Sequence, residues 1–130
     1  MTLDDLLKTR YVKYGRGPDE FDCWGLVRVA RADLFGLDWL PSFVQIDPQD
    51  KAGLTNAAFE AREQGRFVEV GIRPGAIATA WRARLCVHVG IVVEADGRLW
   101  VLETDEGTGP GLIRPANFER RYSKVIYYDN

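Results

Sequence analysis

Apolar residues recur at helical spacing in three parts of the first half of the chain. The first pattern predicts a short capped helix over residues 2–8. The second, with apolar positions three and four residues apart, predicts a longer helix that begins at Cys23 and ends at Gly36. A third helix is predicted over residues 49–63. Glycines and a proline predict a loop over residues 11–19, between the first helix and the second.

Alternation with a period of two replaces the helical pattern in the second half. In residues 85–93 every odd position is apolar, and the even positions, which include Cys86 and His88, form the other face of a strand. Asp96-Gly97 is a strong hairpin turn signal. The predicted strands are residues 67–70, 76–81, 85–93, 98–104 and 124–128, the last at an edge. Helices followed by an antiparallel sheet predict an α+β fold, with residues 1–130 forming one domain. The remaining segments are predicted to be an extended connection, residues 37–48, and a glycine-rich loop, residues 106–111.

The length of the hairpin loop decides which side chain meets His88. A two-residue loop places Asp105 opposite the histidine, with Glu103 diagonal to it. A four-residue loop places Glu103 directly opposite, and a three-residue loop places Thr104 there. Two of the three registers therefore bring a carboxylate to the face of the histidine.

Cys23 lies where the predicted loop becomes a helix, a position whose free N–H groups and dipole favour a thiolate. A thiol nucleophile needs a base, and His88 is the only histidine in the chain. The backbone N–H of Cys23 is a candidate oxyanion donor. The alternative interpretations are a small buried hydrophobe for Cys23 and a hydrogen-bonded core residue for His88. A metal site at Cys86 and His88, or a disulfide between the two cysteines, is a weaker alternative.

Composition excludes several other classes of function. The net charge of −2, with both signs mixed along the chain, argues against nucleic acid as a partner. Residues 114–124 are locally basic and are interpreted as a solvated face. No cofactor is expected. No apolar run has the length of a signal peptide or of a membrane span, which predicts synthesis in the cytoplasm.

Two segments together resemble a known family. The first reads Phe-Asp-Cys-Trp-Gly-Leu-Val at residues 21–27, and the second reads His-Val-Gly-Ile-Val at residues 88–92. They resemble the NlpC-type cysteine peptidases of the papain-like class, in the branch found in phage tail modules and gene-transfer particles. The resemblance covers nearly the whole chain, including a tyrosine upstream of the cysteine and the Arg-Pro-Gly turn at residues 73–75.

The resemblance implies a papain-like fold with Cys23 as nucleophile and His88 as general base. The third residue of the family is usually a histidine in a Leu-His pair, and Leu102-Glu103 takes that place here. Glu103 is thus the expected orienting residue. A second departure is Ala76, where the family usually has Asp.

The resemblance also indicates residues on the substrate side. Tyr11, rather than Tyr14, matches the upstream tyrosine, and Asp22 and Trp24 flank the nucleophile. The implied activity is hydrolysis of peptidoglycan stem peptides, at the bond between D-glutamate and diaminopimelate, during entry of a phage or phage-like particle. Tail or hub proteins are the implied partners, and the tail of a virion or phage-like particle is the implied location. The alternatives are an inactive tail-tip component of the same fold, and an amidase or acyltransferase with the same site.

Overall fold

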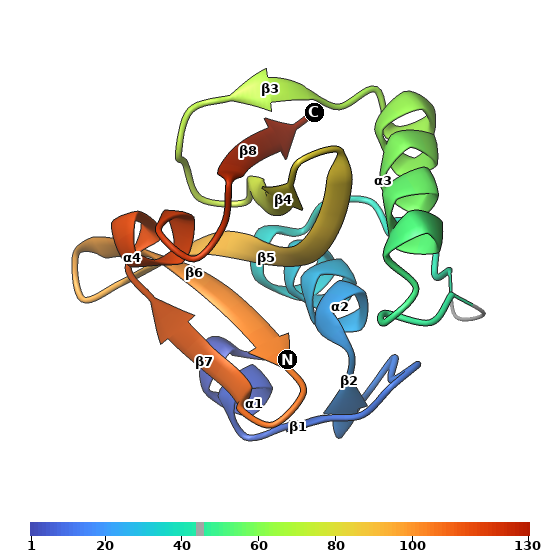
Figure 1. The fold of residues 1–130 in the computed structure, drawn as a ribbon. Helices are drawn as coiled ribbons and strands as arrows, with labels where there is room; N and C mark the ends of the chain where they lie inside the picture. The colour runs from blue at the N-terminus through green and yellow to red at the C-terminus, as the bar shows by residue number, and fades with distance from the viewer. Residues whose placement is uncertain (44–45) are drawn as a thin grey trace.

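The structure is a computed structural model that describes residues 1–43 and 46–130. Its centre is a six-stranded antiparallel sheet with the strand order β3-β8-β4-β5-β6-β7 (Figure 1). The strands of this sheet are β3 (Val68–Val70), β4 (Ile77–Arg82), β5 (Leu85–Ala95), β6 (Arg98–Asp105), β7 (Gly109–Ile113) and β8 (Lys124–Asp129). The helices are α1 (Leu3–Leu7), α2 (Cys23–Phe35), α3 (Lys51–Gly65) and α4 (Pro115–Glu119). The predicted α+β class, with helices packed on an antiparallel sheet, is confirmed.

The segment before α2 is more ordered than the predicted loop. The short strands β1 (Arg10–Tyr11) and β2 (Glu20–Phe21) pair in parallel at its two ends. The Gly15 N–H closes a turn onto the carbonyl of Val12. Two hydrogen-bonded residues at each end leave little periodicity to detect, because the turn residues between them dominate the pattern. The pairing delivers the chain to the first residue of α2.

Helix α2 begins and ends at the predicted residues. The side chain of Asp22 caps its start by accepting the Gly25 N–H, and Gly36 ends it in the left-handed conformation. Leu26, Val27 and Ala30 of its apolar stripe are fully buried. Burial of each such side chain contributes about 1.5–3 kcal/mol to folding, so this packing fixes the helix against the sheet.

Helix α3 begins two residues later than predicted and runs through Gly65, with Arg66 as its left-handed C-cap. The predicted extended connection over residues 37–48 has no regular structure at 37–43, and its residues 44 and 45 lie outside the described residues. None of the described helices has the length and apolar character that crossing a membrane requires.

Two predictions about the C-terminal third are wrong, and one helix there was not predicted. Part of the predicted glycine-rich loop forms β7, which pairs with β6, and residues 115–119 form the unpredicted helix α4. Strand β8 does not lie at an edge, because it pairs with β3 on one side and with β4 on the other. Pairing of this kind joins segments that are distant in sequence, so local patterns carry no signal for it.

The two faces of the sheet carry separate apolar clusters. Residues of α2 pack with the odd positions of β5, including Val89, Ile91 and Val93. The other face holds alanines of β4 together with Val92 and is covered by Phe118 of α4. In Figure 1, α4 accordingly lies apart from α2 and α3. His88 therefore lies where groups from both faces can reach it, near the end of the sheet at which α2 begins.

Candidate active site

Cys23 is the first residue of α2 and is 4% exposed. The Cys23 N–H, at the start of this turn, has no acceptor inside the helix, so it is available to a negatively charged oxygen beside the sulfur. Gly25 is required here because a Cβ at this position would lie 2.2 Å from the carbonyl oxygen of Gly15. The close approach holds the preceding loop against the start of the helix and so fixes the position of the cysteine.

His88 projects from β5 on the face opposite the aliphatic core, as the alternation predicts. Its ring stacks on Tyr122 at 6.3 Å between ring centroids and contacts Phe118 at 6.1 Å. The histidine is 3% exposed. The aromatic rings restrict the orientation of the imidazole, and its two nitrogens are reached from the edges.

Cys86 does not share this face, contrary to the strict alternation of the strand. A β-bulge lies at this point, because Ala80 pairs with His88 whereas Trp81 pairs with Cys86, so Val87 is the extra residue. The extra residue turns Cys86 into the cluster on the α2 side. Both cysteines are free, and the described residues contain no group of three or more potential metal ligands. Nothing in the structure supports the alternatives of a metal site or a disulfide.

The hairpin has the two-residue loop. Ala95 pairs with Arg98 across Asp96-Gly97, and both loop residues have positive φ, as a type I′ turn requires. Regular pairing of β5 with β6 stops at Ile91 and Leu102, before it reaches His88.

The end of the ladder decides which acidic group meets the imidazole. Oε1 of Glu103 lies 2.9 Å from Nε2 of His88, although Glu103 is diagonal to the histidine in this register. Oδ2 of Asp105 lies 3.8 Å from Nδ1. Gly90 is directly across from Glu103 in this register. A Cβ at Gly90 would lie 3.6 Å from Cβ of Glu103 and 2.6 Å from Val101, so the glycine leaves room for the glutamate side chain. Thr104 is on the opposite face of β6, and its buried hydroxyl has no hydrogen-bond partner among the described residues.

The surroundings of His88 favour its protonated form. Burial opposes a charge on the ring, but hydrogen bonds with Cys23 and Glu103 outweigh that effect and raise the pKa of His88 to about 9. For Glu103, burial would raise the pKa, yet hydrogen bonds from His88 and Arg121 lower it. Cys23, His88 and Glu103 thus influence one another at one site, where the carboxylate is ionised and the imidazole readily holds a proton.

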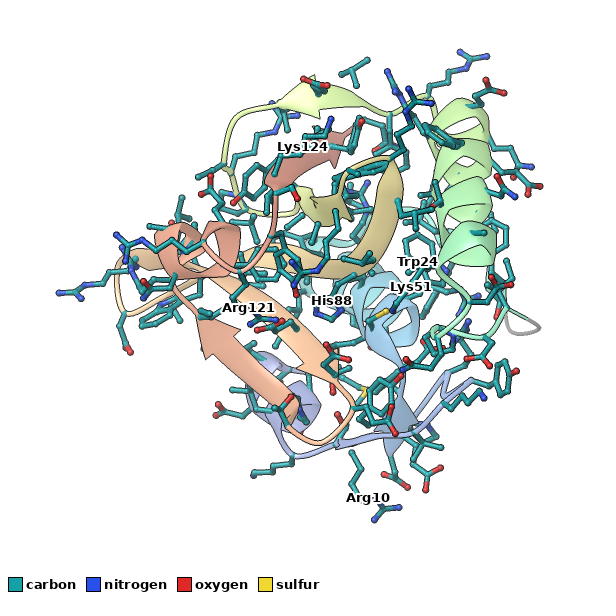
Figure 2. All side chains as sticks on the ribbon, in the orientation of Figure 1. Arg10, Trp24, Lys51, His88, Arg121 and Lys124 are labelled. Carbon is teal, nitrogen blue, oxygen red and sulfur yellow. The ribbon has the colours of Figure 1, made fainter. Side chains whose placement is uncertain are left out.

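The three predicted substrate-side residues have different surroundings. Tyr11 is half-buried and pairs with Phe21, two residues before Cys23, and burial together with the nearby Cys23, Asp22 and Asp105 raises the pKa of its hydroxyl. Trp24, labelled in Figure 2, lines the cavity described below, and its indole N–H donates to the carbonyl of Pro41.

The carboxylate of Asp22 is bound by groups of the protein itself. Its side chain is 2% exposed, and Oδ1 accepts both the Gly25 N–H at 2.8 Å and Nη1 of Arg16 at 2.7 Å. The carboxylate thus caps α2 and pairs with Arg16, and the predicted substrate-side role of Asp22 stays a prediction.

An apolar cavity of about 60 Å³ opens beside the nucleophile. It extends from Cys23 and Trp24 between α3 and the sheet, where Leu54, Phe59 and Trp81 line it. A volume of this size holds several water-sized groups, but apolar walls favour a hydrocarbon group over water. The cleft can therefore receive an apolar part of a molecule that reacts at Cys23.

One residue of the candidate site was not predicted from the sequence. Arg121, from the basic segment interpreted as a solvated face, contacts Glu103 through both guanidinium branches. Arg121 and His88, both labelled in Figure 2, are each bound to Glu103. The only available signal was the clustering of arginines, which does not tell which of them reaches a carboxylate.

No protein-family model matches the chain, and no curated protein is significantly similar to it. The site is thus described by its own geometry: a thiol at a helix start, an imidazole, and a carboxylate held by an arginine.

Proposed function

We propose that this chain is a cysteine peptidase in which Cys23 is the nucleophile, His88 the general acid and base, and Glu103 the residue that orients the imidazole. The observation that carries the proposal is the 2.9 Å contact between Nε2 of His88 and Oε1 of Glu103, together with a cysteine at the start of α2 that raises the pKa of the same imidazole. A nucleophile, its base and a third group that holds the base form the arrangement that acyl transfer uses on many folds.

The geometry supports a specific order of steps. Because Nε2 is engaged by Glu103, the proton of the Cys23 thiol passes to Nδ1 of His88. The sulfur attacks the amide carbonyl, and the Cys23 N–H stabilises the resulting oxyanion. The amide C–N bond breaks as His88 gives the proton to the leaving amine, which leaves a thioester on Cys23. Water, activated by His88, then cleaves the thioester and regenerates the thiol.

The proposed substrate is the peptidoglycan stem peptide, cleaved between D-glutamate and diaminopimelate during entry of a phage or phage-like particle. This part of the proposal comes from the similarity of residues 21–27 and 88–92 to the NlpC-type peptidases of phage tail modules. The pairing of Tyr11 with Phe21, two residues before Cys23, supports it, since a tyrosine upstream of the cysteine belongs to the same pattern.

Incubation of the purified chain with defined muropeptides tests the proposal. We expect cleavage products by mass spectrometry with the unaltered protein and none with Cys23→Ala. Cys86→Ala is the matched control: this second cysteine is buried in the core, and burial raises the pKa of its thiol to about 12, so its loss should preserve cleavage. Absence of cleavage, or equal cleavage by Cys23→Ala, would contradict the proposal and favour a structural role in a tail.

A second candidate is an amidase or acyltransferase that uses the same cysteine and histidine. The apolar cavity at Cys23 favours it, because its walls suit an apolar acyl group better than a charged peptide. Nitrophenyl esters of increasing acyl length separate the two functions. Acylation of Cys23 that grows with chain length and falls in Leu54→Trp, together with intact muropeptides, would favour acyl transfer over peptidoglycan cleavage.

A further inference from the structure

Arg121 holds Glu103, the third residue of the candidate site, through both carboxylate oxygens. Its Nη1 lies 2.7 Å from Oε2 of Glu103, and its Nη2 lies 3.0 Å from Oε1. Two parallel hydrogen bonds of this kind fix both the position and the plane of a carboxylate. The guanidinium is itself held, because Nη2 also donates to the Tyr122 hydroxyl at 2.8 Å.

The same oxygen of Glu103 serves both neighbours. Oε1 accepts from Nε2 of His88 at 2.9 Å and from Nη2 of Arg121 at 3.0 Å, while Oε2 is bound only to Arg121 among the described residues. The Glu103 side chain is 13% exposed, so little water competes for it. The charge of the carboxylate is therefore divided between an imidazole and a guanidinium that is always protonated.

We propose that Arg121 is a positioning residue of the candidate site that acts through Glu103. Its bidentate contact keeps Glu103 turned toward Nε2 of His88, and its charge limits how strongly the carboxylate holds a proton on the imidazole. Without Arg121, Glu103 pairs with His88 alone, and the imidazolium becomes a weaker acid. The effect on turnover rests on the proposed peptidase function, whereas the effect on the protonation of His88 does not.

Charged and titratable groups reach the imidazole from several elements. Cys23 approaches from α2, Glu103 and Asp105 from β6, and Tyr122 from the segment after α4. Arg121 is bound to the Glu103 carboxylate and carries a positive charge. The sign of its influence follows: removal of a nearby positive charge raises the pKa of His88, and removal of the Glu103 charge lowers it.

His88 is the only histidine in the sequence, so an untagged protein gives one set of imidazole signals in a proton NMR titration. We suggest the Cys23→Ala background, because it separates the titration of the imidazole from that of the thiol. The variants are Arg121→Gln, Arg121→Lys, Glu103→Gln and the double variant Glu103→Gln/Arg121→Gln. Circular dichroism verifies folding, and Arg121→Met replaces the glutamine variant if that one does not fold.

We expect Arg121→Gln to raise the pKa of His88 by about half a unit or more, since the lost charge is close but partly exposed. Arg121→Lys keeps the charge and should shift the pKa of His88 less. Glu103→Gln should lower the pKa of His88. In the double variant the effect of Arg121 should largely vanish. A pKa unchanged within about 0.2 units in Arg121→Gln, or a full shift in the Glu103→Gln background, would overturn the proposal.

The same variants distinguish failure of this proposal from failure of the proposed function. If the protein with Cys23 intact cleaves muropeptides, Arg121→Gln should move the alkaline limb of the kcat/KM profile to higher pH and Arg121→Lys should restore it. If no substrate is cleaved but the NMR shifts occur, the link between Arg121 and His88 stands and the peptidase function falls. Cleavage with no shift in either measurement leaves Arg121 a merely structural residue.

Discussion

His88 gives the fold a dependence on pH whose direction follows from its surroundings. Burial opposes a charge on the imidazole, but the hydrogen bonds with Cys23 and Glu103 raise its pKa to about 9 in the folded protein. In the unfolded chain the value returns to about 6.5. The folded state therefore binds this proton more tightly, and the resulting stability is fully present below about pH 6.5 and is lost as the pH rises through about 9.

The size of the effect follows from the difference between the two pKa values. A difference of roughly 2.5 units, at about 1.4 kcal/mol for each, corresponds to about 3 kcal/mol of unfolding free energy. The perturbation that removes it is His88→Gln, which keeps a polar side chain but does not titrate. We expect the unaltered protein to lose about 3 kcal/mol more stability than His88→Gln between pH 6 and pH 10.

Urea unfolding followed by tryptophan fluorescence measures this difference, because the chain contains four tryptophans. Both proteins are compared at both pH values with a reducing agent present, so that the two free cysteines stay reduced. Glu103→Gln is a useful third protein, since it removes one of the two hydrogen bonds that raise the pKa of His88. Its unfolding free energy should therefore fall less between pH 6 and pH 10 than that of the unaltered protein. Stabilities of the unaltered protein and His88→Gln that change in parallel with pH would refute the reasoning.

Three further predictions concern the elements that support the site. Gly25→Ala should destabilise the protein by about 3 kcal/mol in urea, because the added methyl meets a backbone oxygen, whereas Gly71→Ala, with no atom within 4 Å, should have little effect. Arg31→Met should lower stability by about 3 kcal/mol, since it breaks a buried ion pair, and a calorimetric Tm within 2 °C of the original would contradict this. Asp22→Ala should lower the unfolding free energy, measured by thermal unfolding, by about 1–2 kcal/mol through loss of the helix cap, and further because Arg16 loses its partner. Asp22→Asn should recover part of the contribution of the cap.

The local elements were predictable from the sequence because their signals are local. The Thr2 and Asp5 side chains form the capping box of α1, and α2 begins at Cys23 and ends before Gly36, as the pattern indicates. The Asp96-Gly97 turn was predictable for the same reason, since only certain residues accept positive φ at both positions. Each of these features depends on neighbours within about four residues.

The chemistry of the candidate site was only partly predictable. Residue type alone selects Cys23 and His88, because a thiol at a helix start needs a base and the chain holds a single histidine. The sequence left open which group faces the imidazole. In the structure the two-residue loop sets the register, yet Glu103 rather than Asp105 makes the short contact, because the ladder ends before it reaches His88.

What only the tertiary structure decided is long-range pairing. The sequence determined an α+β chain with a nucleophile at the start of a helix and a histidine on an alternating strand. It did not determine the bulge that turns Cys86 into the core, the place of β8 between β3 and β4, or the bond between Arg121 and Glu103. The physical reason is common to all three: each depends on contacts between segments that only the folded sheet brings together, and such contacts leave no periodic trace in the chain.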